Sequence, residues 1–183
     1  DLEITHKYTD STKKYTVTIE QKQKFSEFPL FKLPLMVDIY SGGKTERKKI
    51  TVTKAKEDFV FDVASKPDLV NVDAEKQLLC TKTEIKSTKE LVFQYKNCPL
   101  WLDRYEALAE LAKKPNDPDA TFIIIAALND KYWSLRSDAI SKLKDITSEA
   151  NKPLIKEILI SLAKSDKKAT VRSEALNALY TYI

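Results

Sequence analysis

The spacing of apolar residues changes once along the chain, near residue 84, and this change constrains the fold more than any other feature. Before it, apolar and polar residues alternate, as in residues 15–19, where Tyr, Val and Ile are separated by Thr. After it, apolar residues recur every three or four positions. Alternation is typical of strands with one buried face, and the longer spacing is typical of helices. We therefore predict two domains, an antiparallel β-sandwich over 1–84 and all-α helical repeats over 85–183.

Six or seven short strands are expected in the first domain. Turn-forming residues separate the alternating runs, and Gly42-Gly43 predicts a tight hairpin because glycine readily adopts positive φ. No helical segment separates the strands, which excludes parallel βαβ units and favours a sandwich. The alternating runs centre on residues 2–8, 15–19, 35–39, 50–52 and 59–63.

Helices are expected over 88–96, 100–114, 118–129, 131–146, 152–164 and 168–182. Ser87 and Glu90 form a capping box before the first apolar run, with serine at the cap and glutamate three residues later. Pro99, Pro115, Pro118 and Pro153 fall at or near predicted helix ends, where proline is tolerated.

A short pattern occurs three times in the second half: arginine, any residue, an acid, alanine, leucine or isoleucine, two further residues, and leucine. It begins at Arg104, Arg136 and Arg172, at offsets of 32 and 36 residues. A period of this size predicts stacked helix pairs, an α-solenoid. We expect each arginine to bridge adjacent pairs, and the alternative is that one of them binds a substrate. The alanines and final leucines should be buried: Ala107, Ala139, Ala175, Leu111, Leu143 and Leu179.

Charge and hydropathy favour neither a nucleic-acid partner nor a membrane span. The net charge is +4, from 31 basic and 27 acidic residues, which is too balanced to imply nucleic acid. No apolar run approaches the roughly 18 residues that span a bilayer. The densest basic stretch predicts a solvated strand edge, and the alternative is a patch for nucleic acid or acidic lipid; it contains Lys44, Arg47, Lys48, Lys49, Lys54 and Lys56.

The residues needed for most catalytic and metal sites are missing. His6 is the single histidine, so no H-E-x-x-H zinc motif can form. Cys80 and Cys98 are not spaced as a C-x-x-C pair, and we expect free, partly buried thiols. We therefore predict no catalytic residue, no cofactor-binding residue and no metal ligand in this chain. Five aspartates lack the spacing of calcium ligands, and we expect them to be ordinary strand-end and turn carboxylates. They are Asp38, Asp58, Asp62, Asp68 and Asp73.

Two remaining sets of residues carry simple structural predictions. His6 shares a strand face with Leu2 and Ile4, so it should be a partly buried structural histidine. The aromatic residues near helix starts are interpreted as packing residues rather than a ligand platform, and these are Trp101, Tyr105, Tyr132 and Trp133.

Several stretches carry a resemblance to known families. The repeated pattern over about 100–183 resembles HEAT-type repeats. Residues 2–4, 66–79, 93–97 and 102–107 look like the strand that opens a small sandwich, its last strands, and the first helices of a helical cap. Together with the order of the parts, these stretches resemble the C-terminal, non-catalytic part of gluzincin zinc aminopeptidases of the aminopeptidase N family, in its bacterial branch.

The resemblance implies a role without chemistry in this chain. The family's zinc-binding H-E-x-x-H and its G-x-M-E-N motif are both missing here, so no cofactor is expected in the chain and zinc is expected in an absent catalytic domain. The implied partners are that catalytic domain of the same polypeptide and the peptide substrates of the parent enzyme. Both chain ends lie inside predicted elements, and we expect a fragment. The alternative function is a non-enzymatic scaffold or protein-interaction module, similar to a TBP-associated factor.

A cluster of apolar residues around Pro29 and Pro34 does not alternate cleanly, so no single sheet face can bury it all. Two interpretations remain open. The cluster closes one end of the sandwich core, or it forms a surface on which the catalytic domain packs. Its members are Phe25, Phe28, Leu30, Phe31 and Leu33.

Overall fold

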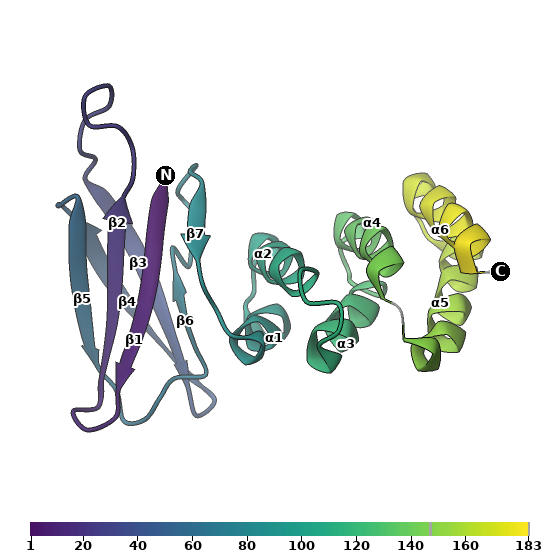
Figure 1. The fold of residues 1–183 in the computed structure, drawn as a ribbon, viewed down its shortest axis with the longest axis horizontal. Helices are drawn as coiled ribbons and strands as arrows, with labels where there is room; N and C mark the ends of the chain where they lie inside the picture. The colour runs from purple at the N-terminus through teal and green to yellow at the C-terminus, as the bar shows by residue number, and fades with distance from the viewer. Residues whose placement is uncertain (147, 183) are drawn as a thin grey trace. The chain divides into compact units, whose positions relative to one another are not determined.

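The structure, a computed structural model, describes residues 1–146 and 148–182, with side chains described as far as residue 180. The chain forms two compact units, Asp1–Glu90 and Leu91–Ile183. The first unit contains two β-sheets, and six α-helices follow in the chain (Figure 1).

Seven strands make up the first unit: β1 (Leu2–Thr9), β2 (Lys14–Gln21), β3 (Leu33–Ser41), β4 (Lys44–Val52), β5 (Lys56–Asp62), β6 (Leu69–Val72) and β7 (Lys82–Glu84). One sheet has the order β5-β2-β1-β7 and the other β4-β3-β6. Alternate residues of both sheets belong to one buried apolar cluster, with Val17 and Ile19 from the first sheet and Val37 and Val52 from the second. Alternation therefore buries one face of each sheet, as the sequence predicts.

The hairpin between β3 and β4 is confirmed. Ser41 pairs with Lys44, and the two residues between them, Gly42 and Gly43, have φ of 56° and 74°. Residues with a side chain rarely adopt this left-handed region, whereas glycine does so at little cost.

The expectation of a purely antiparallel unit is wrong at one edge, where β1 and β7 run parallel. After β6 the chain leaves the second sheet and returns beside β1 in the same direction. Asp73 holds this crossing, because its carboxylate accepts hydrogen bonds from the backbone N–H groups of Gln77 and Leu78 at 3.0 and 3.2 Å. Neither the crossing nor the three-residue β7 contains apolar alternation, so the sequence pattern could not predict them.

The helices are α1 (Thr88–Asn97), α2 (Trp101–Leu111), α3 (Pro118–Ala127), α4 (Trp133–Lys142), α5 (Lys152–Ser165) and α6 (Ala169–Tyr182), with short 3-10 turns at Leu143–Asp145 and Glu149–Asn151. All six were expected, but α2 and α4 end earlier than predicted. The apolar spacing continues through Leu143 and Ile146, although the backbone tightens into a 3-10 turn after Lys142.

Side-chain caps begin two of the helices. Glu90 accepts a hydrogen bond from the Ser87 N–H at 2.8 Å, while the Ser87 hydroxyl accepts one from the Glu90 N–H at 3.3 Å. This reciprocal pair confirms the capping box. Asp117 caps α3 by accepting from the N–H groups of Asp119 and Ala120.

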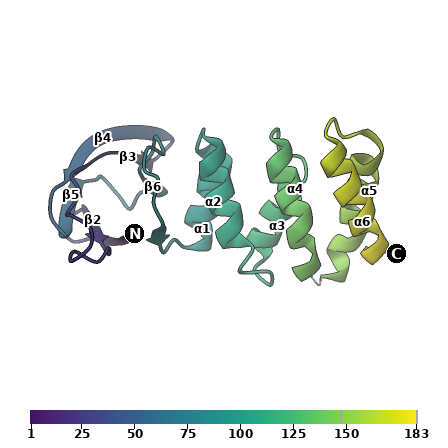
Figure 2. The same ribbon diagram turned by 90° about the horizontal axis from the view of Figure 1, so that it is seen from above.

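The repeated pattern places the same residues in the core of the helical unit. Ala107, Ala139 and Ala175 are fully buried, and Leu111, Leu143 and Leu179 are buried beside them, at most 8% exposed. This confirms the predicted burial of the six repeated positions. Within this unit the helix pairs follow one another in chain order, from α1 and α2 to α5 and α6 (Figure 2). No helix in the described part of the chain is long and apolar enough to cross a bilayer.

Candidate functional site

The loop between β2 and β3 presents a cluster of apolar side chains to solvent. Phe25, Phe28, Leu30 and Phe31 are 45–53% exposed, whereas Leu33 packs against the core cluster. The interpretation that all five residues close the sheet core is therefore wrong for four of them. We call Phe25, Phe28, Leu30 and Phe31 the exposed apolar cluster.

Two glutamine amides hold this loop in place. The buried Gln21 amide donates to the Phe31 carbonyl at 2.8 Å and accepts from the Phe31 N–H at 3.0 Å. Gln23 donates to the Gln21 side chain and to the Pro29 carbonyl, each at 3.0 Å. A turn follows, in which the N–H groups of Glu27 and Phe28 donate to the Lys24 carbonyl. The polar framework leaves the aromatic rings outside the core, so their exposure follows from local hydrogen bonding.

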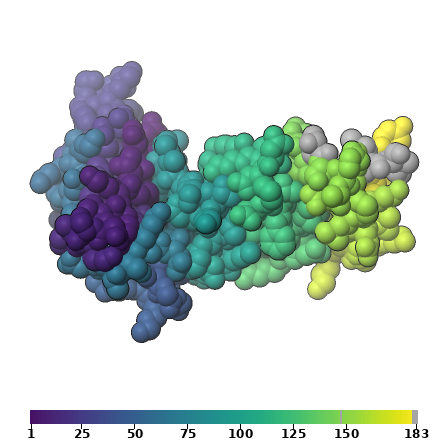
Figure 3. Space-filling model, turned by 60° about the horizontal axis from the view of Figure 1, so that its bottom comes forward, coloured from purple at the N-terminus to yellow at the C-terminus, as the bar shows by residue number. Residues whose placement is uncertain are grey.

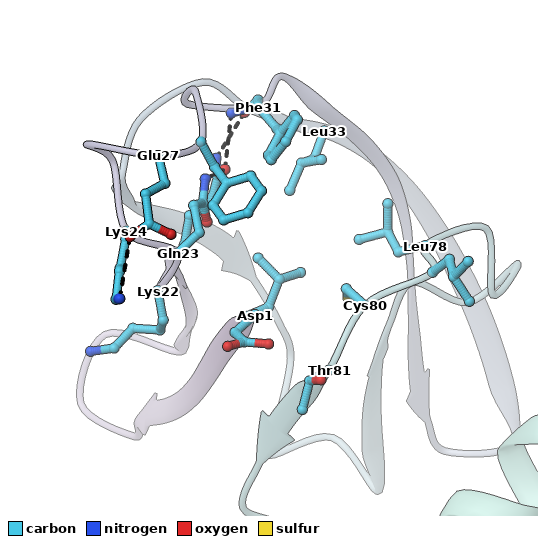
Figure 4. Close-up of a pocket in the computed structure, with 14 residues that line it drawn as sticks. Asp1, Lys22, Gln23, Lys24, Glu27, Phe31, Leu33, Leu78, Cys80 and Thr81 are labelled. Atoms are coloured by element: carbon cyan, nitrogen blue, oxygen red, sulfur yellow. Dashed lines mark hydrogen bonds and ion pairs between the residues drawn. The ribbon is translucent and has the colours of Figure 1, made fainter.

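A cavity of about 780 Å³ lies beside this loop. Phe31 and Leu33 line one side, and Leu78 and Cys80 line the other (Figure 4). Charged side chains, including Lys22, lie at its rim (Figure 4). An apolar hollow with a polar rim is typical of sites that receive an apolar protein segment. The lining residues include no histidine.

A buried charge cluster lies elsewhere in the same unit. Glu84 contacts His6 Nε2 through one oxygen and Lys86 Nζ through the other, each at 2.7 Å, and the three side chains are 5–11% exposed. Burial alone would raise the pKa of Glu84, but the Lys86 ammonium, the His6 hydrogen bond and the Lys82 charge hold it well below its usual range. His6 is thus a partly buried structural histidine, as predicted.

The carboxylates and cysteines singled out from the sequence do not come together as a site. Among the described residues, no group of three or more histidine, cysteine or acidic side chains could hold a metal ion. Cys80 is exposed, Cys98 is buried, and neither forms a disulfide. Each aspartate has its own structural partner: Asp38 pairs with Arg47, Asp58 with Thr18, Asp62 with Lys14, Asp68 with the Gly42 N–H, and Asp73 with the Gln77 and Leu78 N–H groups.

The basic stretch lies largely on β4, which is an edge strand as expected. Arg47 forms a two-point contact with Asp38 at 2.7 and 2.8 Å and a third contact with Glu75. Lys48 contacts Glu46. These acids neutralise part of the positive charge along the edge strand.

Two of the three repeated arginines bridge consecutive helix pairs, which confirms the prediction for Arg104 and Arg136, whereas Arg172 contacts only its own pair in the described part of the chain. Arg104 in α2 reaches Asp130 in the α3–α4 turn at 3.0 Å, and Arg136 in α4 reaches Asp166 in the α5–α6 turn at 2.6 Å. The hydrogen bond from Arg136 lowers the pKa of Asp166 below its ordinary value. The sequence reasoning missed both aspartates, although each stands six residues before a repeated arginine.

The aromatic residues near helix starts support this packing. The Trp101 ring stacks on Tyr105, with centroids 5.3 Å apart, and its indole N–H donates to the Ser134 hydroxyl at 3.0 Å. The Arg104 guanidinium lies over the Tyr132 ring and Lys168 lies over the Trp133 ring. These contacts within the helical unit agree with a packing role.

Comparisons with known proteins relate this fold to that of an aminopeptidase. No family model matches the sequence, and no curated protein matches it either. Among solved structures, the chain is similar to aminopeptidase A of Legionella pneumophila, solved in complex with aspartic acid. The similarity has a TM-score of 0.60 at 14% identity and covers 99% of this chain but only 27% of that one. The chain therefore has an aminopeptidase-related fold and spans about a quarter of that protein's length.

Proposed function

We propose that this chain is a non-catalytic segment of a zinc-dependent aminopeptidase, built as a β-sandwich followed by HEAT-like repeats. It supports the catalytic domain and restricts the access of peptides to the active site. The observation that carries this proposal is the near-complete coverage of both units, in order, by part of one aminopeptidase chain. Fold similarity alone does not establish an activity, so the residues must agree with it.

The residue inventory agrees with a supporting role. Catalytic zinc sites in proteins use three side-chain ligands, mostly histidine with glutamate or cysteine, and this sequence has one histidine and two cysteines. That histidine already contacts the buried Glu84. The zinc and the catalytic base would therefore come from the catalytic domain, which together with peptide substrates is the proposed partner of this chain.

Metal analysis and an activity assay test the proposal directly. The isolated chain should hold no stoichiometric zinc and should not release the reporter from aminoacyl substrates. The control is the longer polypeptide encoded by the same gene, whose upstream part should contain H-E-x-x-H and cleave the same substrates with bound zinc.

The possible outcomes separate the two candidate functions. One tightly held zinc per isolated chain would overturn the supporting role. A longer polypeptide with neither H-E-x-x-H nor activity would overturn the peptidase proposal and favour the scaffold alternative.

A further inference from the structure

The arginine contacts of the helical unit form a ladder that uses each aspartate twice. Arg104 and Arg136 each bind the aspartate carboxylate of the next helix pair through Nε and Nη2. The distances are 3.0 and 3.4 Å from Arg104 to Asp130. They are 2.6 and 2.8 Å from Arg136 to Asp166. Arg136 and Arg172 also bind within their own pair, where Nη1 donates to the backbone carbonyls of Asp130 and Asp166 at 2.7 and 2.8 Å. Each turn is therefore fixed by its own pair and by the pair before it.

The two ends of this ladder differ. In the first pair, the position six residues before the arginine is the buried Cys98 instead of an aspartate. No repeated arginine precedes this pair, so no forward contact is needed there. In the third pair the arginine is retained as Arg172. Its Nη1 is used, while its Nε and Nη2 have no hydrogen-bond partner within the described part of the chain.

The third pair also differs in the burial of the apolar residue that stands four positions after the repeated arginine. Leu108 and Ile140 stand four residues after their arginines, and they are 0% and 6% exposed. Leu176 stands at the same position after Arg172, yet it is 63% exposed, and Tyr180 beyond it is 88% exposed. Other apolar residues of α6 are buried, since Val171 and Ala175 are 0% and Leu179 is 8% exposed. What α6 lacks is the cover that the following helix pair supplies to α2 and α4.

Within the helical unit, colours on the surface run in chain order from teal to yellow-green (Figure 3). Each pair thus borders the pairs next to it in the sequence, as in other stacked repeats. A repeat that ends such a stack usually turns a polar face outward. The outer face of α6, with Leu176 and Tyr180, does not follow this rule.

We propose that Arg172, Leu176 and Tyr180 form the stacking surface for a further helix pair of the same polypeptide. An aspartate in the turn of that pair would receive Arg172 Nε and Nη2. The repeat itself identifies what covers this surface. The two equivalent arginines, Arg104 and Arg136, each bind an aspartate in the turn of the next helix pair. A planar guanidinium with two free, parallel N–H donors also selects a carboxylate. This inference stands independently of the peptidase proposal.

The chain can test the proposal with its own sequence. A second copy of residues 148–183 is appended after Ile183, which preserves the offset of 36 residues and supplies an aspartate equivalent to Asp166. The extended chain should gain helical circular dichroism, and its urea unfolding midpoint should rise above that of the original chain. Leu176→Lys should abolish this rise.

Single substitutions identify the contact. Arg172→Gln should lower the midpoint of the extended chain by more than that of the original chain, where only the Nη1 hydrogen bond to the Asp166 carbonyl is lost. Asp→Asn in the appended turn should also lower the midpoint of the extended chain, and the double variant should lose no more than Arg172→Gln alone. Arg136→Gln is the positive control and should lower the midpoint of both chains.

Other results would overturn the proposal. One is an appended copy that stays unfolded while the original chain is folded. Another is an Arg172→Gln variant whose urea unfolding midpoint falls by the same amount in both chains. Concentration-dependent dimerisation of the original chain that Leu176→Lys removes would identify a second copy as the occupant, and would likewise overturn it.

Discussion

Glu84 is a charged residue of the sheet unit that is buried between Lys86 and His6. It is 5% exposed in its side chain, and Lys86 is 6% exposed. Removing one partner of a buried ion pair leaves the other charge desolvated, which costs about 3–5 kcal/mol. Glu84→Gln should therefore destabilise the chain by about that amount at neutral pH. Asp10→Asn, in the exposed pair with Lys13, is the matched control and should have little effect.

The pH dependence of the stability difference between the wild type and Glu84→Gln tests whether the charge of Glu84 causes it. The pKa of Glu84 is lowered in the folded state, so in acid the unfolded state binds the proton first and stability falls. The contribution of Glu84 is present above the ordinary carboxyl pKa of about 4.3 and is lost as pH falls below it. Urea unfolding between pH 7 and pH 2 should show the wild type and Glu84→Gln converging. A gap that stays constant through this range would contradict the charge assignment.

The sequence predicts the position of His6 but not its contact with Glu84. His6 was predicted on the core face of its strand, because alternation fixes which side chains point inward. Its partner could not be predicted, because Glu84 lies 78 residues away and meets His6 through the parallel β1–β7 contact. No local pattern encodes that pairing.

At the scale of elements, apolar spacing predicted the existence of the helices better than their ends. All six helices form, and the repeated alanines and leucines are buried. The spacing of apolar side chains continues through a 3-10 turn, so it does not mark where α4 ends. The β7 strand escaped prediction because three residues are too few to show alternation.

Leu143 gives a quantitative test of the repeat. It is 1% exposed in the helical core, and Leu→Ala at such sites costs about 2–5 kcal/mol, because a cavity remains. Leu143→Ala should therefore lower the free energy of unfolding by about that amount. Leu176→Ala, at a position 63% exposed, is the matched control and should change it by less than about 0.5 kcal/mol. Similar losses at both positions would contradict the burial pattern.

At the scale of the whole molecule, the candidate interaction surface was only half predicted from the sequence. The irregular run around Pro29 left two interpretations open, because its outcome depends on polar contacts between segments. Gln21 and Gln23 bind the backbone of the loop and keep the rings out of the core. Hydrogen bonds of this kind leave no periodic trace in a sequence.

The exposed apolar cluster carries the last prediction. Large exposed apolar patches in soluble proteins mark interaction sites, and the partner that we expect at this one is the catalytic domain of the proposed function. Without that domain, the isolated chain should self-associate through the cluster, and sedimentation should show its mass rising with concentration. The Phe28→Ser/Phe31→Ser variant should remain monomeric and folded, because both side chains are about half exposed. Val60→Ser, at a position 53% exposed on β5, is the control and should associate like the wild type. A wild-type chain that stays monomeric throughout would remove the cluster as the docking surface.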